Sequence, residues 1–196
     1  MIRPMTDVFS RARGRQKWAV VVLFGVLAGL MVWWWSHATV FEGRLGAKPV
    51  AAMQKGAGSR AVFVGVGIPD AHGDGDETIT FRSTSVDVAE NTAGAHASLA
   101  VCERAGRTDL VGSVLGTPLQ YCSAIRPVVK GTRMRWQEGG QPSEYLVLRV
   151  VPTHPGTVAV DGISVSYRRS WSHGWQQGTE KAAVNVRVEG APAPPR

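Results

Sequence analysis

Short runs of alternating apolar and polar residues dominate the chain between residues 58 and 189. A period of two places successive side chains on opposite faces of a strand, so it predicts strands with one buried face. The runs fall at residues 62–66, 79–81, 86–88, 99–101, 146–150, 158–167 and 184–188. Turn-forming Gly, Pro and Asp separate them, and no convincing amphipathic helix lies between. The pattern predicts an all-β domain of short strands, a sandwich or a barrel.

The alternation changes parity once, around Asp161-Gly162. Val158 and Val160 share one parity, whereas Ile163 and the following apolar residues have the other. One additional residue containing Gly would restore the inward face, which predicts a β-bulge. A hairpin turn at Asp-Gly is the alternative. The bulge is favoured because a hairpin would leave a first arm of only about four residues.

Residues 18–35, from Trp18 to Trp35, contain no charged residue. As a helix this run would measure about 27 Å, close to the thickness of a bilayer's hydrocarbon core. Residues 1–17 carry four arginines and one lysine against Asp7, and the positive-inside rule places such a segment in the cytoplasm. We therefore expect a cytoplasmic N-terminus, a transmembrane helix over 18–35 and an extracytoplasmic remainder, in a single-pass protein of the cell membrane.

Two alternatives concern this helix. A signal peptide could be cleaved after Ala38, but an uncleaved anchor is favoured because the apolar run exceeds the usual 7–15 residues. Gly25 and Gly29 form a GxxxG motif that can bring helices together. A lone anchor helix is favoured over a homodimer, because small residues are common in membrane helices.

The remaining organisation follows from composition. Residues 36–57 show little periodicity and are expected to form a stalk or linker, with at most a short strand near residues 39–45. The β domain is expected over 58–189, and the Pro-rich end, 190–196, is expected to be disordered. Cys102 and Cys122 are the only cysteines. An even pair in an exported domain predicts a disulfide, worth about 3 kcal/mol.

Charge and motifs exclude several classes of function. The formal net charge is +7, but residues 1–17 account for +4, so the folded part lacks the concentrated charge of a nucleic-acid binder. There is no GxSxG, SxxK or HExxH, and we expect no catalytic residue, cofactor or metal site. The acidic stretch DAHGDGDE at 70–77 matches an EF-hand loop only in part, with Phe81 at position twelve. A solvated turn is favoured there.

The stretch YRRSWSHGWQQGT is the strongest candidate for a contact surface. If it were extended, one face would carry Tyr167, Arg169, Trp171, His173 and Trp175. Such an aromatic ladder could stack on a sugar ring or on a partner chain. The favoured alternative is a connection between strands that turns at His173-Gly174, with Tyr167 and one Trp packed at the rim of the core.

Three motifs in residues 144–179 carry a family resemblance: PTHPG at 152–156, VDGISVSY at 160–167 and GWQQGT at 174–179. They resemble the ectodomains of small membrane-anchored proteins of high-GC Gram-positive bacteria, although Glu180 stands where that family often has Gln. The resemblance implies an immunoglobulin-like antiparallel β-sandwich outside the cell, and it implies no activity. The cysteine spacing is too short for the inter-sheet bridge of an immunoglobulin domain.

These observations predict a non-enzymatic, membrane-anchored module of the cell envelope. Its partner would be an unknown envelope protein, in an interaction or structural role. The alternative is a domain that binds cell-wall glycan through Trp171 and Trp175.

Overall fold

The structure is a computed structural model that describes residues 7–41, 45–54, 60–68, 77–106, 111–136, 143–171 and 174–190. These residues form one helix and ten strands. The elements are α1 (Asp7–Ser36), β1 (Ala47–Gln54), β2 (Val62–Gly67), β3 (Glu77–Asn91), β4 (His96–Arg104), β5 (Ser113–Leu115), β6 (Cys122–Pro127), β7 (Arg133–Trp136), β8 (Glu144–Val151), β9 (Gly156–Trp171) and β10 (Gly174–Gly190).

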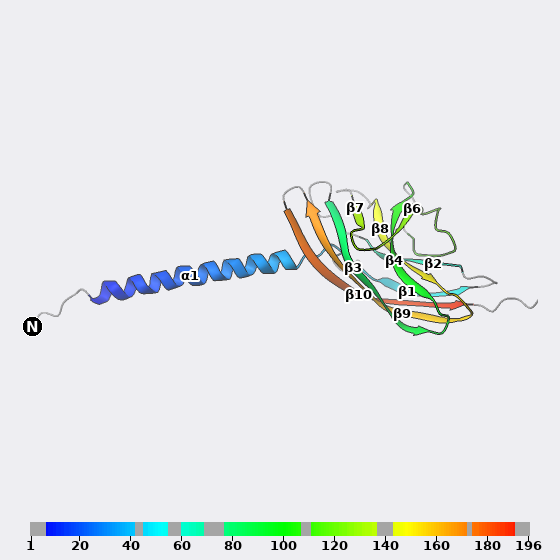
Figure 1. The fold of residues 1–196 in the computed structure, drawn as a ribbon, viewed down its shortest axis with the longest axis horizontal. Coiled ribbons are helices and arrows are strands. Elements are labelled where there is room, and N and C mark those ends of the chain that lie inside the picture. Colours follow the sequence, from blue (N-terminus) through cyan, green and yellow to red (C-terminus); the bar gives the residue numbers. More distant parts are fainter. Residues whose placement is uncertain are drawn as a thin grey trace, which may run out of the picture.

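The strands form two five-stranded sheets that pack face to face as a β-sandwich (Figure 1). The first sheet has the order β1-β10-β9-β3-β7, and the second has the order β5-β2-β8-β4-β6. Only β1 and β10 pair in parallel; every other pair is antiparallel. The apolar side chains expected to face inward fill the space between the sheets, which confirms the predicted all-β sandwich.

The first sheet is built on three long strands, β3, β9 and β10. Strand β9 runs unbroken through Asp161-Gly162, and Val160 and Ile163 are both buried. Against β3, Gly162 pairs with Asp87 and Val160 pairs with Val88, so Asp161 is the additional residue. The predicted β-bulge is therefore present, and the hairpin alternative at this position is wrong.

The second sheet is covered on both of its faces. Its inner face contributes to the main core, and its outer face carries a smaller apolar cluster that includes Phe63, Tyr145 and Val147. Val111, which lies between β4 and β5 in the chain, adds to this cluster. Burial on both faces explains why β8 is nearly continuous in apolar residues instead of alternating, with only Arg149 exposed between buried neighbours.

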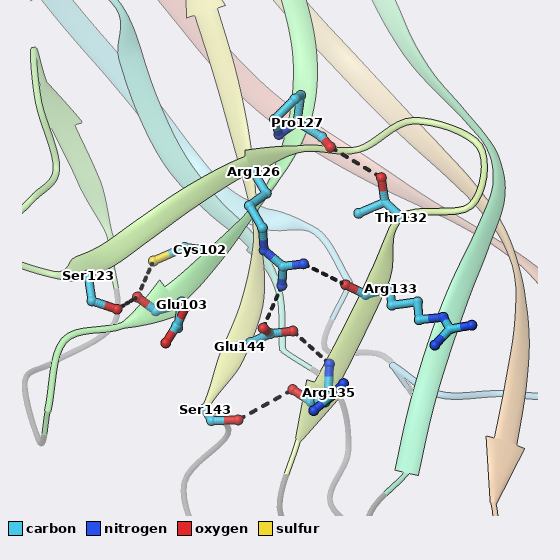
Figure 2. A network of polar contacts seen from close by, with 10 residues as sticks. All are labelled: Cys102, Glu103, Ser123, Arg126, Pro127, Thr132, Arg133, Arg135, Ser143 and Glu144. Carbon is cyan, nitrogen blue, oxygen red and sulfur yellow. Dashed lines mark hydrogen bonds and ion pairs between the residues drawn. The ribbon is translucent and has the colours of Figure 1, made fainter.

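A polar network joins the two sheets at the edge where β7 lies beside β6 and β8 (Figure 2). One carboxylate oxygen of Glu144 accepts from Arg126 at 2.5 Å, and the other accepts from the backbone N–H of Arg135 at 2.7 Å. The Arg126 guanidinium also donates to the carbonyl of Arg133 at 3.2 Å. One half-buried carboxylate thus connects strands of both sheets.

Helix α1 extends away from one end of the sandwich (Figure 1). It begins at Asp7 instead of Trp18, because the basic segment before the apolar run consists largely of good helix formers and joins the same helix. Trp18–Ser36 has a mean hydropathy of 2.0, and none of it is buried by the rest of the protein. The helix is long and apolar enough to cross a membrane, and it is not a core helix of the sandwich.

The described residues of the segment expected to be a stalk, 36–41 and 45–54, instead belong to the fold. Ala38, Val40, Phe41 and Leu45 are buried in the main core, and β1 adds a strand to the first sheet. The folded unit therefore begins directly after the helix, 20 residues before the expected start at residue 58. The sequence did not predict this, because the buried residues of the segment do not follow a regular period of two.

Candidate functional site

The side chains of Ser36 and His37 cap the C-terminal end of α1. The Ser36 hydroxyl contacts the carbonyl of Val32 at 2.9 Å, and Nδ1 of His37 lies 2.8 Å from the carbonyl of Trp33. The His37 ring also stacks on the Trp33 ring, with centroids 5.0 Å apart. These bonds satisfy carbonyl groups that the last turn of a helix leaves without intrahelical partners.

The helix end is then fixed to the first residues of β10. The Ala38 N–H donates to the carbonyl of Gln177 at 3.1 Å, and the side-chain amide of Gln176 donates to the carbonyl of Trp34 at 3.2 Å. Trp35 and Trp175 meet edge to face, with centroids 5.1 Å apart. The chain therefore passes from the helix into the sandwich without a free linker. We call this contact, residues 34–41 against 167 and 175–180, the helix–hairpin junction.

Tyr167 lies at the centre of the helix–hairpin junction and is fully buried. Its hydroxyl oxygen accepts from the Val40 N–H at 2.9 Å, and its proton lies between the Ala38 carbonyl, at 2.9 Å, and the carboxylate of Glu180. The same carboxylate oxygen accepts from the N–H groups of Val40 and Phe41, at 2.8 and 3.2 Å. The N–H groups of Ala38, Val40 and Phe41 and the carbonyl of Ala38 therefore all have partners at this end of the sandwich.

Burial raises the pKa of the Tyr167 phenol well above its usual value, and the bond to the negatively charged Glu180 raises it further. The phenol therefore stays protonated throughout the physiological range. A neutral phenol can donate to the incoming chain and also accept from it, which a phenolate could not do.

Gly178 makes the close approach possible. A Cβ at this position would lie 2.2 Å from the carbonyl oxygen of Ala38 and 3.1 Å from the Tyr167 hydroxyl. The obstructing atom belongs to the backbone, so no side-chain rotation would relieve the contact. The helix–hairpin junction therefore requires glycine here for space.

The expected aromatic ladder does not form among the described residues. Strands β9 and β10 are joined through residues 172–173, and Trp171 pairs with Gly174, so Trp175 lies on the returning strand. Tyr167 faces the core, whereas Trp175 is 38% exposed on the outer face with the Arg168 guanidinium 4.7 Å above its ring. Arg169 is partly buried. The prediction that these five side chains share one face was wrong, because it assumed that the chain stays extended from Tyr167 to Trp175.

The side chains of Trp171 and His173 lie outside the described residues, so their predicted contact role stays a prediction. The favoured alternative, a connection between strands with Tyr167 packed inside, is confirmed for the described part. Gly174, which was expected in the turn, is instead the first residue of β10.

The predicted disulfide between Cys102 and Cys122 is present, with the Cα atoms 5.4 Å apart and both residues fully buried. It joins β4 and β6, which are neighbours in the second sheet, and it belongs to the outer cluster. Within that cluster the Val111 N–H donates to the Tyr145 hydroxyl at 3.1 Å. The bridge of an immunoglobulin domain joins two sheets, so the immunoglobulin-like classification stays a prediction.

The described residues say less about the GxxxG motif, the EF-hand-like stretch and metal binding. A Cβ at Gly25 or Gly29 would meet nothing within 4 Å, so this face of α1 is open within the chain, and dimerisation stays a prediction. The EF-hand-like stretch lies outside the described residues, except for its end at Glu77 and Phe81. Over the parts of the chain that the structure describes, no group of three or more His, Cys, Asp or Glu is placed to hold a metal ion.

Sequence reasoning missed Ala38, Gln176, Gly178 and Glu180 as parts of a site. The motif GWQQGT contains two of them, Gln176 and Gly178, but its role depends on a helix end about 140 residues earlier in the chain. Comparison with known proteins finds no protein-family model that matches the chain and no matching curated protein.

Proposed function

We propose that this protein is a single-pass membrane protein whose uncleaved helix α1 holds the β-sandwich against the extracytoplasmic face of the membrane. The sandwich acts there as a non-enzymatic interaction module for another protein of the cell envelope. The orientation follows from the basic residues that precede the apolar run. The exposed apolar surface of α1 supports insertion in a membrane, because water would solvate such a surface poorly.

One observation carries the proposal: the end of the helix is built into the sandwich. Cleavage after Ala38 would remove the carbonyl that accepts from Tyr167 and the indole of Trp35 that packs on Trp175. It would also separate Ala38, itself buried, from Val40 and Phe41. A signal peptide has no reason to contribute to the fold that remains after its removal, whereas an anchor that positions its domain does.

A fixed helix end also suits an interaction module. A domain on a flexible stalk samples many orientations and loses that freedom when it binds. Here the helix–hairpin junction fixes the height and orientation of the first sheet relative to the membrane before a partner arrives. The surface presented to a membrane-bound partner is thereby organised in advance.

The test has two readouts on membranes from cells that express the full-length chain. Intact mass should give the uncleaved chain of 21.0 kDa. A protease that cannot cross the membrane should degrade the sandwich in spheroplasts and leave a cytoplasmic control protein intact. A mature chain that begins at Thr39, or a protected sandwich, would contradict the proposal. Crosslinking followed by mass spectrometry should then recover an envelope protein, and recovery of the bait alone under several growth conditions would count against the interaction role.

A further inference from the structure

A polar pocket lies directly beside the helix–hairpin junction, on the outer face of the first sheet. Its volume is about 460 Å³, within the range of small-ligand sites. Its lining includes Ser36 from α1, Arg82 from β3, Lys130 from the β6–β7 connection, and Ser166, Gln177 and Thr179 from β9 and β10. Five segments distant in sequence therefore converge on one hollow.

The charges that the described residues bring to this pocket have a single sign. Arg82 and Lys130 line it, and no carboxylate is among the described lining residues. Glu180 is adjacent in sequence, but its carboxylate accepts bonds from Tyr167 and Val40 within the helix–hairpin junction. In the described part of the chain neither lining cation has a carboxylate within ion-pair distance. The pocket therefore presents uncompensated positive charge.

A β-bulge in β3 sets the direction of the Arg82 side chain. Phe81 pairs with Tyr167 and Ser83 with Ser166, so Arg82 is an additional residue on β3, and such bulges redirect side chains. Its guanidinium donates to Oε1 of Gln177, two strands away, at 2.6 Å. A guanidinium has five N–H donors, so the group is held in position with donors remaining.

Hydroxyl groups complete the lining. The Ser166 and Thr179 hydroxyls lie 2.8 Å apart, and this bond uses the proton of only one of them. The other proton remains available to an acceptor in the pocket. A guanidinium, an ammonium and hydroxyl donors together form the donor set that recognises phosphate oxygens.

A second hollow on the same sheet provides an internal contrast. It has a volume of about 430 Å³ and contains Lys181, but Asp87 and Asp161 also line it. Its charge is compensated within the protein. Size alone therefore does not distinguish the pocket beside the helix; the charge does.

We infer that the pocket formed by Arg82, Lys130, Ser166 and Thr179 binds a phosphate group. The position of the pocket indicates which kind of molecule supplies this phosphate group. Ser36, in its wall, directly follows the apolar run and the indoles of residues 33–35, so in the proposed topology the pocket lies at the depth of the lipid headgroups. This assignment to an anionic phospholipid rests on the proposed function, whereas the affinity for phosphate does not. A bound headgroup would orient the first sheet relative to the bilayer.

The experiment uses the full-length chain in a neutral detergent. Short-chain phosphatidylglycerol, the corresponding phosphatidylcholine and inorganic phosphate are titrated in separate arms, and backbone amide shifts of residues 166 and 177–179 report occupancy. The double variant Arg82→Gln/Lys130→Gln is compared with Arg149→Gln/Lys181→Gln. The control pair carries the same change in net charge at two exposed positions outside the pocket.

We expect phosphatidylglycerol to bind more tightly than phosphatidylcholine, and the pocket variant to weaken binding about tenfold or more. The control variant should stay within about twofold of wild type. Saturable binding of inorganic phosphate alone, lost in the pocket variant, would support the phosphate site and assign it to a soluble ligand. Equal binding of both lipids would overturn the assignment to an anionic phospholipid, and equal loss in the two double variants would overturn the phosphate site itself. Protease accessibility of the same variants in membranes separates this failure from a failure of the proposed topology.

Discussion

Replacing Gly178 by alanine should loosen the helix–hairpin junction without altering the rest of the sandwich. The new Cβ would lie 2.2 Å from the Ala38 carbonyl oxygen, so the entering chain must move away. That movement breaks the bond from Ala38 to Gln177 and the bond from Tyr167 to Ala38, each worth about 1 kcal/mol. With the strain of the displaced backbone, the loss should reach about 2–3 kcal/mol.

Thermal unfolding of the full-length chain in lipid nanodiscs, followed by near-ultraviolet circular dichroism, measures this loss. For a domain of this size the Tm should fall by roughly 5–10 °C. Limited proteolysis should also detect faster cleavage between residues 36 and 41. A merely weakened core would not direct cleavage to that segment.

The matched control is Gly162→Ala in β9 of the same sheet. A Cβ there would lie 3.5 Å from its nearest neighbours, which is ordinary contact. This variant should keep the stability of wild type or gain up to about 1 kcal/mol, because alanine restricts the unfolded chain. If Gly178→Ala unfolds at the same temperature as Gly162→Ala, the close packing of helix and hairpin inferred from this glycine is refuted.

Three further outcomes follow from the described contacts. Because the folded state raises the pKa of Tyr167, the folded protein keeps this proton above about pH 10 while the unfolded chain loses it. Stability should therefore be insensitive to this group below pH 10 and fall above it, by up to about 1.4 kcal/mol per pH unit, and Tyr167→Phe should remove that part of the slope in urea unfolding. The double variant Cys102→Ala/Cys122→Ala should lose about 3 kcal/mol in the same assay, and unchanged stability would refute the loop-closure argument. Glu144→Ala should lose about 1–3 kcal/mol, because it leaves Arg126 and a backbone N–H without their shared acceptor, and double-mutant cycles with Arg126→Ala should show that the two losses are not additive.

The strands of the sandwich were predictable where alternation was uninterrupted. The period-two runs located β2, β3, β9 and β10, and the parity change at Asp161-Gly162 located the bulge. The apolar run at 146–150 located β8, although that strand is buried on both faces. These signals are local, because residues i and i+2 of a strand face the same side of the sheet. The inward positions of one strand can therefore be recognised without knowing its partners. The disulfide was also predictable, since an even number of cysteines in a domain expected to be exported predicts one.

The helix–hairpin junction was not predictable from such local signals. Ala38, Val40 and Phe41 contact residues more than 120 positions later, and no periodicity marks a segment that caps the end of a sandwich. Glycine at 178 has an ordinary backbone conformation, so turn chemistry gave no reason for it. Glycine is needed at this position because the Ala38 carbonyl lies against it, and only folding brings these two residues together.

The central claim is that helix α1 and the sandwich form one rigid body. Spin labels on Leu27→Cys in α1 and Asn185→Cys in β10 test it, because both side chains are exposed and the native cysteines are bonded to each other. Pulsed dipolar spectroscopy in lipid nanodiscs should give one narrow distance distribution. A broad distribution would contradict the fixed helix–hairpin junction, and protein purified from membranes with one label per chain and no dipolar coupling would indicate a chain that has lost its helix.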